Sequence, residues 1–365
     1  MKKIITMTIT EACNLKCLYC YENNKSSHTM SFETAKNIID HEISQLSKED
    51  EIEFDLFGGE PLMNFKLIQQ IDSYLTSKYS GINFILFITT NGTLVNGYIK
   101  EWLRERKDYF ICGLSYDGTP EMQNINRYNS ANDIDLGFFA ETYPKQGIKM
   151  TVSRESLYKL ADGVIYLHNK GFEIACNLAY DIDWHDMKYR EVLQKELIKL
   201  IEYYLEHSDI SPCSMLGGDI SNVAVSSKEK KYIRWCGAGL SASTYYIDGT
   251  RYPCHFFMPL SVGEEKAKKS LNIKFYDKEI PSEVMDKKCL DCVIQSICPT
   301  CYGANYASTG NIYLHDDNYC ELFKIIAKAR SYFKAKQWEL GQLKTLSTEK
   351  EQALLQSIHI IQNDL

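Results

Sequence analysis

Three cysteines near the amino terminus have the spacing of a metal-binding loop. Cys13, Cys17 and Cys20 are separated by three and then two residues in the segment CNLKCLYC. A cubane iron–sulfur cluster normally takes four cysteines, so a cluster held by these three would leave one iron open to a ligand that is not protein. A zinc site or three reduced thiols would also fit this short segment.

This spacing, with the aromatic Tyr19 just before the last cysteine, resembles the radical S-adenosylmethionine (SAM) superfamily. The resemblance implies that SAM binds the open iron through its amino and carboxylate groups. It also implies that an electron from the cluster cleaves SAM to a 5′-deoxyadenosyl radical, which abstracts hydrogen from a substrate.

Further segments resemble the parts of that family that contact SAM. In the turn Gly58-Gly59-Glu60-Pro61, glycines permit close approach of the backbone, and Glu60 can accept a charge-assisted hydrogen bond from an ammonium group. The resemblance adds candidate contacts for the SAM ribose or carboxylate and weaker ones beside them: Asn91, Ser115, Arg127, Ser153 and Tyr19. For Asn91-Gly92 and Asp117-Gly118, ordinary turn chemistry is the alternative.

Seven further cysteines lie between residues 236 and 320: Cys236, Cys254, Cys289, Cys292, Cys298, Cys301 and Cys320. Their spacing resembles the SPASM domain, which implies two auxiliary 4Fe-4S clusters and three clusters in all. One departure is that two residues, not three, separate Cys298 from Cys301. The alternative is a zinc ribbon on Cys289, Cys292, Cys298 and Cys301, which leaves the other three cysteines unexplained.

The resemblance also divides these cysteines into two ligand sets. Cys289, Cys292, Cys298 and Cys320 would complete one auxiliary cluster. Cys236, Cys254 and Cys301 would hold the other, with one iron short of a protein ligand. Either that iron is open to a substrate thiolate, or Cys213 fills the position; the sequence leaves both possibilities open.

His255 follows Cys254 directly. In anaerobic sulfatase-maturating enzymes, which the chain resembles in plan, this position holds an aspartate proposed as the catalytic base. A histidine here looks more like maturases of ribosomally made peptides, including those that form thioethers. His255 is therefore our candidate catalytic residue, either as a proton acceptor or as a donor that tunes the neighbouring cluster.

Composition narrows the class of protein. The chain has 365 residues, 13 cysteines and a net charge of −7. The negative charge argues against a nucleic-acid partner. We see no signal peptide and no apolar stretch long enough for a membrane span, which predicts a cytoplasmic protein, where clustered cysteines usually bind metal.

The first 180 residues alternate strand and helix patterns, which predicts a parallel sheet with right-handed crossovers. We expect an α/β fold, a partial (β/α)6 TIM-like barrel followed by a cysteine-rich domain and C-terminal helices. Each polar motif follows a strand, as ligand sites do in such barrels. The expected strands are 3–10, 52–57, 83–89, 110–116, 148–153 and 172–178. The expected helices are 31–45, with its N-cap at Ser31, 65–79, 94–106 and 155–170.

Four parts are predicted along the chain. The barrel covers residues 1–207 and ends in a long helix, 184–207. An irregular bridge covers 208–235, and the SPASM region covers 236–320. A helical tail covers 321–365, with helices at 321–337 and 349–361.

Together these features predict a radical SAM/SPASM maturase that modifies a ribosomally made peptide by oxidative cross-linking, through a thioether or a carbon–carbon bond. Formylglycine formation in a sulfatase and peptide epimerisation are alternative reactions. A non-catalytic iron–sulfur or zinc-binding module is the alternative of another class. Expected partners are a precursor peptide and a reductant such as flavodoxin or ferredoxin. Because the cysteine loop begins at residue 13, no N-terminal leader-binding domain is expected, and a separate leader-recognition protein is a further expected partner.

Overall fold

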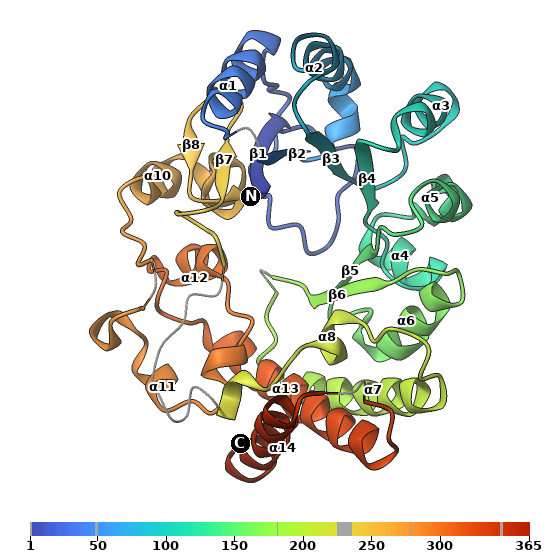
Figure 1. Cartoon of the computed structure of the whole chain (residues 1–365), viewed down its shortest axis with the longest axis vertical. Coiled ribbons are helices and arrows are strands. Elements are labelled where there is room, and N and C mark those ends of the chain that lie inside the picture. The colour runs from blue at the N-terminus through green and yellow to red at the C-terminus, as the bar shows by residue number, and fades with distance from the viewer. Residues whose placement is uncertain (1, 48–49, 181, 225–235, 278, 344–345) are drawn as a thin grey trace.

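The computed structural model describes residues 2–47, 50–180, 182–224, 236–277, 279–343 and 346–365. Six strands arranged around an open centre form an incomplete barrel (Figure 1). They are β1 (Lys2–Thr10), β2 (Glu51–Gly58), β3 (Phe84–Thr90), β4 (Phe110–Leu114), β5 (Ile148–Val152) and β6 (Ile174–Leu178). Each of these strands begins and ends within two residues of its predicted bounds. The predicted α/β fold class is confirmed.

The barrel has a seam between β4 and β5. Strands β1 to β4 pair in parallel in chain order, and β5 and β6 form a separate parallel pair. A single bridge between Ser115 and Lys149 joins the two groups. Because successive side chains of a strand point to opposite faces, Phe54 and Leu56 of β2 are buried under the helices, while Asp55 faces the interior of the barrel.

Crossover helices surround the strands. They are α1 (Phe32–Ser44), α2 (Phe65–Lys78), α3 (Gly97–Arg106), α4 (Pro120–Asn126), α5 (Leu136–Thr142), α6 (Leu160–His168) and α7 (Met187–Glu206). The sequence did not indicate α4 and α5, which divide the connection between β4 and β5. Each has only seven residues, too few for helical periodicity to show. Thr119 and Asp135 cap their amino ends.

The cysteine-rich region extends the barrel's sheet. Strand β7 (Ser243–Tyr245) pairs in parallel with β1, and β8 (Arg251–Tyr252) pairs antiparallel with β7. Helices α10 (Pro259–Ser270), α11 (Lys287–Leu290) and α12 (Tyr302–Thr309) follow. Phe257, Met258 and Tyr302 are part of a second hydrophobic core, separate from that of the barrel.

The C-terminal helices close the structure at the side of α7 (Figure 1). They are α13 (Asp317–Glu339) and α14 (Thr348–Asp364). Leu322 and Phe333 of α13 belong to the barrel's core, so α13 is part of the main body. The predicted bridge contains the short helix α8 (Ser214–Gly217), and its residues 225–235 lie outside the described part. The four domain bounds stay a prediction.

Among the described helices, none is both long enough and apolar enough to span a bilayer.

Ser31 caps α1 as the sequence predicts, because its hydroxyl accepts the Thr34 N–H at 3.0 Å. We expect Ser31→Ala to lower the free energy of unfolding by about 1 kcal/mol, since a backbone donor loses its partner. Urea unfolding followed by circular dichroism measures the change. Ser73→Ala, at an exposed position inside α2, is the control and should have no such cost. Equal stability of Ser31→Ala and the parent would contradict the capping role.

Candidate functional site

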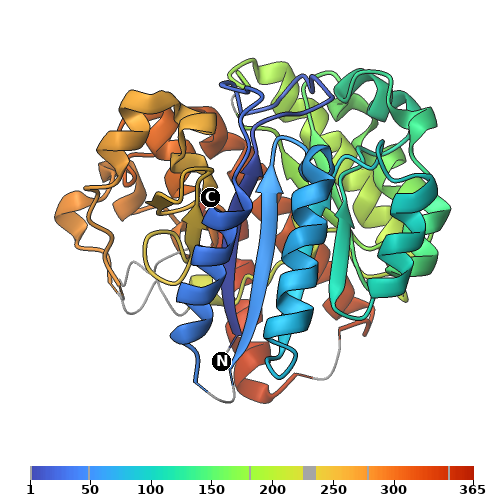
Figure 2. The same cartoon turned by 90° about the horizontal axis from the view of Figure 1, so that it is seen from above.

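The loop that carries the first three cysteines lies at the carboxyl ends of the strands (Figure 2). It leaves β1 at Thr10 and returns beside it, because Thr10 and Thr29 form an antiparallel bridge and Glu11 N donates to His28 O at 3.0 Å. We refer to residues 11–29 as the cysteine loop. Cys13, Cys17 and Cys20 on it are all partly exposed.

A fully buried carboxylate, Asp117, fixes this loop to the barrel. It accepts hydrogen bonds from Arg127 Nε at 2.9 Å, from Asn126 Nδ2 at 3.2 Å and from the Thr151 backbone N–H at 2.9 Å. The hydroxyl of Tyr19 also donates to it, and the Arg127 guanidinium lies 5.5 Å from the centre of the Tyr19 ring. Burial alone would lower the pKa of Arg127, but the interactions with Asp117, Tyr19 and Cys17 together outweigh it and raise that pKa. Tyr19 and Arg127 therefore position the loop.

The glycine turn after β2 packs directly on the cysteine loop. Gly59 N donates to Thr10 O at 3.2 Å, and Glu60 N donates to Ala12 O at 2.8 Å. A Cβ on Gly59 would lie 2.5 Å from Ala12 O, and one on Gly58 would lie 2.2 Å from Thr10 O. The glycines are therefore needed for close approach of two backbones of this chain.

Glu60 is directed into the protein. It is 1 % exposed, and its carboxylate accepts from Leu62 N at 3.1 Å, Thr90 Oγ1 at 2.8 Å and Asn91 N at 2.7 Å. Burial raises its pKa against the opposing effect of these hydrogen bonds. The Asn91 side chain in turn donates to Asn14 Oδ1 at 2.9 Å. Both residues thus tie the turns after β2 and β3 to the cysteine loop.

The remaining predicted contacts differ in accessibility. Pro61 is buried at the first position of a short 3-10 helix. Ser153 is fully buried, and its hydroxyl donates to Asn126 Oδ1 at 2.7 Å. Ser115 is partly exposed at the end of β4, so its hydroxyl is open to a ligand at the barrel mouth.

The thiols of the cysteine loop could bind a metal as thiolates. Burial raises the pKa of Cys13 to about 11 and also raises that of Cys17. Such thiols stay protonated at neutral pH unless a bound metal deprotonates them. Lys25 Nζ donates to Cys20 Sγ at 2.7 Å and to Glu22 O at 2.9 Å. Three thiols on one immobilised loop are a donor set that fits an iron–sulfur cluster.

In the cysteine-rich region one group of thiols gathers around Cys298. Burial raises its pKa, and the neighbouring thiols of Cys292, Cys320 and Cys289 raise it further. Cys289 in turn lies near Cys320 and Cys292, and burial with these charges raises its pKa to about 12. His315 Nδ1 lies 3.4 Å from Cys289 Sγ.

A second group contains the other three cysteines. Burial raises the pKa of Cys254, and the nearby thiols of Cys301 and Cys236 raise it further. Cys301 also lies near Cys236. The division of the seven cysteines into two ligand sets stays a prediction.

Neither group resembles a site for one ion. Within the described residues, no three His, Cys, Asp or Glu side chains gather as a single metal ion requires. Tetrahedral zinc would bind each sulfur at about 2.3 Å, whereas a cubane bonds each cysteine to a different iron. A small cavity bordered by Cys298, Cys301, Cys320 and His315 lies where the two groups meet. The two auxiliary clusters stay a prediction.

Three other cysteines lie in the core. Cys112 and Cys176 are buried, as the sequence predicts for packing residues. Cys213 is also fully buried, with its thiol near Tyr204 and Cys176. These surroundings give no support to Cys213 as a ligand beside Cys254.

His255 lies among aromatic rings. Its ring centroid is 5.0 Å from that of Phe57 and 5.9 Å from that of Tyr21. Burial, with a smaller effect of Lys149, lowers its pKa to about 4. A base with this pKa is poorly matched to proton transfer near neutral pH, and the catalytic role of His255 stays a prediction.

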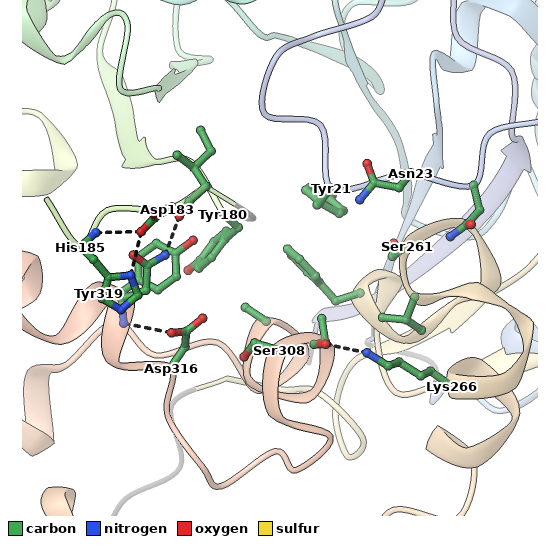
Figure 3. A pocket seen from close by; sticks show the side chains of 17 residues that line it. Tyr21, Asn23, Tyr180, Asp183, His185, Ser261, Lys266, Ser308, Asp316 and Tyr319 are labelled. Atoms are coloured by element: carbon green, nitrogen blue, oxygen red, sulfur yellow. Dashed lines mark hydrogen bonds and ion pairs between the residues drawn. The ribbon is translucent and has the colours of Figure 1, made fainter.

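A cavity of about 500 Å³ lies beside the cysteine loop (Figure 3). Tyr21 and Asn23 of the loop line one wall, and Tyr180 and Asp183, after β6, line the opposite one. The rest of the wall comes from α10, α12 and the start of α13. Cys20 precedes Tyr21 directly, so the cavity reaches the loop that carries the thiols.

The barrel interior contains a charged pair that the sequence analysis missed. Lys149 Nζ donates to Thr89 Oγ1 at 2.7 Å, and burial lowers the pKa of Lys149. Asp55 Oδ1 is buried without a hydrogen-bond partner, and burial raises the pKa of Asp55 to about 6 despite the opposing effect of Lys149. The sequence feature that could have indicated this pair is a polar residue at an inward-facing position of each strand, β2 and β5.

Comparisons with known proteins agree with these features. Residues 5–123 match the family model of a 4Fe-4S single cluster domain. An uncharacterised protein of Methanocaldococcus jannaschii is 36% identical over 173 residues, which are 46% of this chain and 58% of that protein. The chain therefore spans less than two thirds of this relative's length.

Two further matches cover most of the chain. The radical SAM cyclopropyl synthase TigE of Paramaledivibacter caminithermalis is 23% identical over 89% of this chain and 73% of its own length. The structure of native anSMEcpe with bound AdoMet and the Cp18Cys peptide superposes with a TM-score of 0.66 at 18% identity, and covers 94% of this chain and all of that one. The latter shows a shared fold.

The Asp117 contacts predict a large stability effect. We expect Asp117→Asn to lower the free energy of unfolding by about 3–5 kcal/mol, because Arg127 then keeps a buried charge without its partner. Urea unfolding measures the loss. Asp135→Asn removes the exposed ion pair with Lys100 and is the matched control, expected to cost under about 1 kcal/mol. A loss for Asp117→Asn no larger than the control's would contradict the role of Asp117.

The Asp55 carboxylate predicts a pH-dependent effect. Its folded-state pKa is raised to about 6, so its ionised form opposes folding above pH 6, and this penalty disappears as the pH falls towards 4. We expect Asp55→Asn to be more stable than the parent in urea unfolding at pH 8, by about 2–3 kcal/mol, with the gain lost as the pH falls below about 4. The exposed Asp108→Asn should show no such trend. A pH-independent difference for Asp55→Asn would refute the assignment.

Proposed function

Since the chain belongs to the radical SAM superfamily, we propose that it is a SPASM-type maturase that modifies a peptide. The observation that carries the proposal is the cavity between the cysteine loop and the cysteine-rich region. Its wall joins the loop proposed to hold the SAM-binding cluster to helices proposed to flank the auxiliary clusters. A peptide in this cavity would meet both.

The cavity's lining suits a peptide rather than a small ion. Tyr21, Tyr180 and Phe256 supply flat apolar surface, and Asn23, Asn24 and Ser261 supply polar groups. Peptide substrates present apolar side chains and backbone amides together, which such mixed pockets bind. The peptide-bound structure of similar fold supports this choice of substrate class.

We place SAM at the barrel mouth, against the cysteine loop, the Gly58-Gly59 backbone and the Ser115 hydroxyl. In this proposal Glu60, Asn91 and Arg127 act as positioning residues, since their polar groups already hold the loop. Pro61, Tyr19 and Ser153 support the same arrangement from buried or partly buried positions. When bound, the cluster and SAM supply a 5′-deoxyadenosyl radical that removes a hydrogen atom from the substrate.

We further propose that the three-cysteine set of Cys236, Cys254 and Cys301 leaves an iron open for a substrate thiolate. The buried position of Cys213 among core side chains supports this reading. Thioether formation is then the favoured modification. His255, beside Cys254, packs against Phe57 and would act in this proposal by tuning the neighbouring cluster.

The function is tested with anaerobically reconstituted protein, dithionite and SAM. We expect about twelve iron atoms per chain, the sum of three four-iron clusters, and release of 5′-deoxyadenosine measured by liquid chromatography. Cys17→Ala should retain about eight iron atoms per chain. It should release no 5′-deoxyadenosine, because one ligand of the SAM-binding cluster is lost.

Cys112→Ala is the control, since Cys112 lies in the barrel core, and it should behave like the parent. Stoichiometric zinc, or no 5′-deoxyadenosine from fully loaded protein, would overturn the proposal. Mass spectrometry of a candidate precursor peptide incubated with the loaded protein should show a loss of two hydrogens, whereas an unchanged mass with altered stereochemistry would indicate epimerisation.

A further inference from the structure

We propose that His315 is a positioning residue that donates a hydrogen bond from Nδ1 to the sulfur of Cys289, and so sets the reduction potential of the auxiliary cluster that Cys289 would help to hold. The proposal rests on the cluster assignment made above. It concerns a residue that lies outside the cysteine pattern, five positions before Cys320.

His315 is fixed to the helix that carries Cys289. Its backbone N–H donates to Asp286 Oδ2 at 3.1 Å, and its carbonyl accepts from Lys288 Nζ at 2.7 Å. Asp286 caps α11, and Lys288 lies in that helix beside Cys289. Two contacts to one short helix hold the main chain of His315 beside Cys289.

The imidazole reaches two partners with its two nitrogens. Nδ1 lies 3.4 Å from Cys289 Sγ, and Nε2 lies 3.4 Å from Thr300 Oγ1. Thr300 Oγ1 also accepts from Asn305 Nδ2 at 3.0 Å. The Thr300 hydroxyl hydrogen is therefore available for the His315 ring.

This arrangement selects one tautomer. A thiolate bound to iron has lone pairs only, so the contact with Cys289 is favourable when Nδ1 carries the hydrogen. The Thr300 hydroxyl then donates to Nε2. Thr300 lies between Cys298 and Cys301, in the segment that carries one cysteine of each ligand set.

A hydrogen bond to a ligating sulfur stabilises the more negative, reduced state of a cluster, and such bonds are one cause of the wide range of cluster potentials. Without the bond from His315, the potential of this cluster should fall. The other auxiliary cluster, held by Cys254 and its partners, should keep its potential.

The experiment uses the full chain with Cys13, Cys17 and Cys20 all changed to Ala, so that only the auxiliary clusters contribute. After anaerobic reconstitution with iron and sulfide, this parent should carry about eight iron atoms. Electron paramagnetic resonance during a potentiometric titration measures the two midpoint potentials. In His315→Phe we expect one midpoint to fall by about 59 mV, equal to a tenfold change in a one-electron equilibrium.

Thr300→Val keeps the imidazole but removes the group that fixes its tautomer, so it should shift the same midpoint in the same direction by less. Thr300→Val also tests the role of His315 if His315→Phe takes up too little iron for the titration. His359→Phe, an exposed histidine of α14, is the control and should change neither midpoint. Unchanged midpoints in His315→Phe and Thr300→Val at full iron would refute the role of His315. A parent with far fewer than eight iron atoms would instead refute the cluster assignment.

Discussion

The buried contact between Asp117 and Arg127 is the constraint on which the site depends. Asp117 follows β4, and it accepts a hydrogen bond from the backbone of Thr151 in β5. Asp117 therefore bridges the seam between two sheets. One sheet contains β1 to β4 with β7 and β8, and the other is the β5–β6 pair. The same carboxylate binds Tyr19 of the cysteine loop. In a low-dielectric interior such a fully paired network is rigid. The carboxylate that closes the seam of the barrel therefore also fixes the position of the cysteine loop.

The cysteine-rich region holds the cysteine loop from the other side. Tyr21 stacks on Phe256 with ring centroids 4.1 Å apart, and Asn24 N donates to Leu260 O at 3.1 Å. Strand β7 adds to the open edge of β1, which removes an unpaired strand edge. The loop is thus fixed by two bodies with separate hydrophobic cores, and the cavity lies where they meet.

The strands were predictable because runs of β-branched and aromatic residues alternate with helical periodicity along the first half. Cysteine spacing gave the ligand candidates for a similar reason, since the loop's chemistry is local in sequence. The directions of Glu60, Asn91 and Arg127 were not predictable, because their partners lie up to 77 residues away and depend on how the strand ends meet. The pairing of Asp55 with Lys149 was not predictable, because β2 contributes one of these residues and β5 the other.

The interior of the barrel contains two ionisable groups whose pKa values are shifted by burial. A fold shared at 18% identity does not specify a substrate, so the chemistry of this chain depends on its own side chains. Lys149 crosses from β5 to Thr89 on β3, beneath the strand end that carries Ser115. Asp55 keeps an oxygen without a partner, at a cost in stability that packing alone does not require. Ionisable groups whose pKa values are shifted by burial are typical of functional sites, and in this chain Asp55 and Lys149 are two such groups inside the barrel.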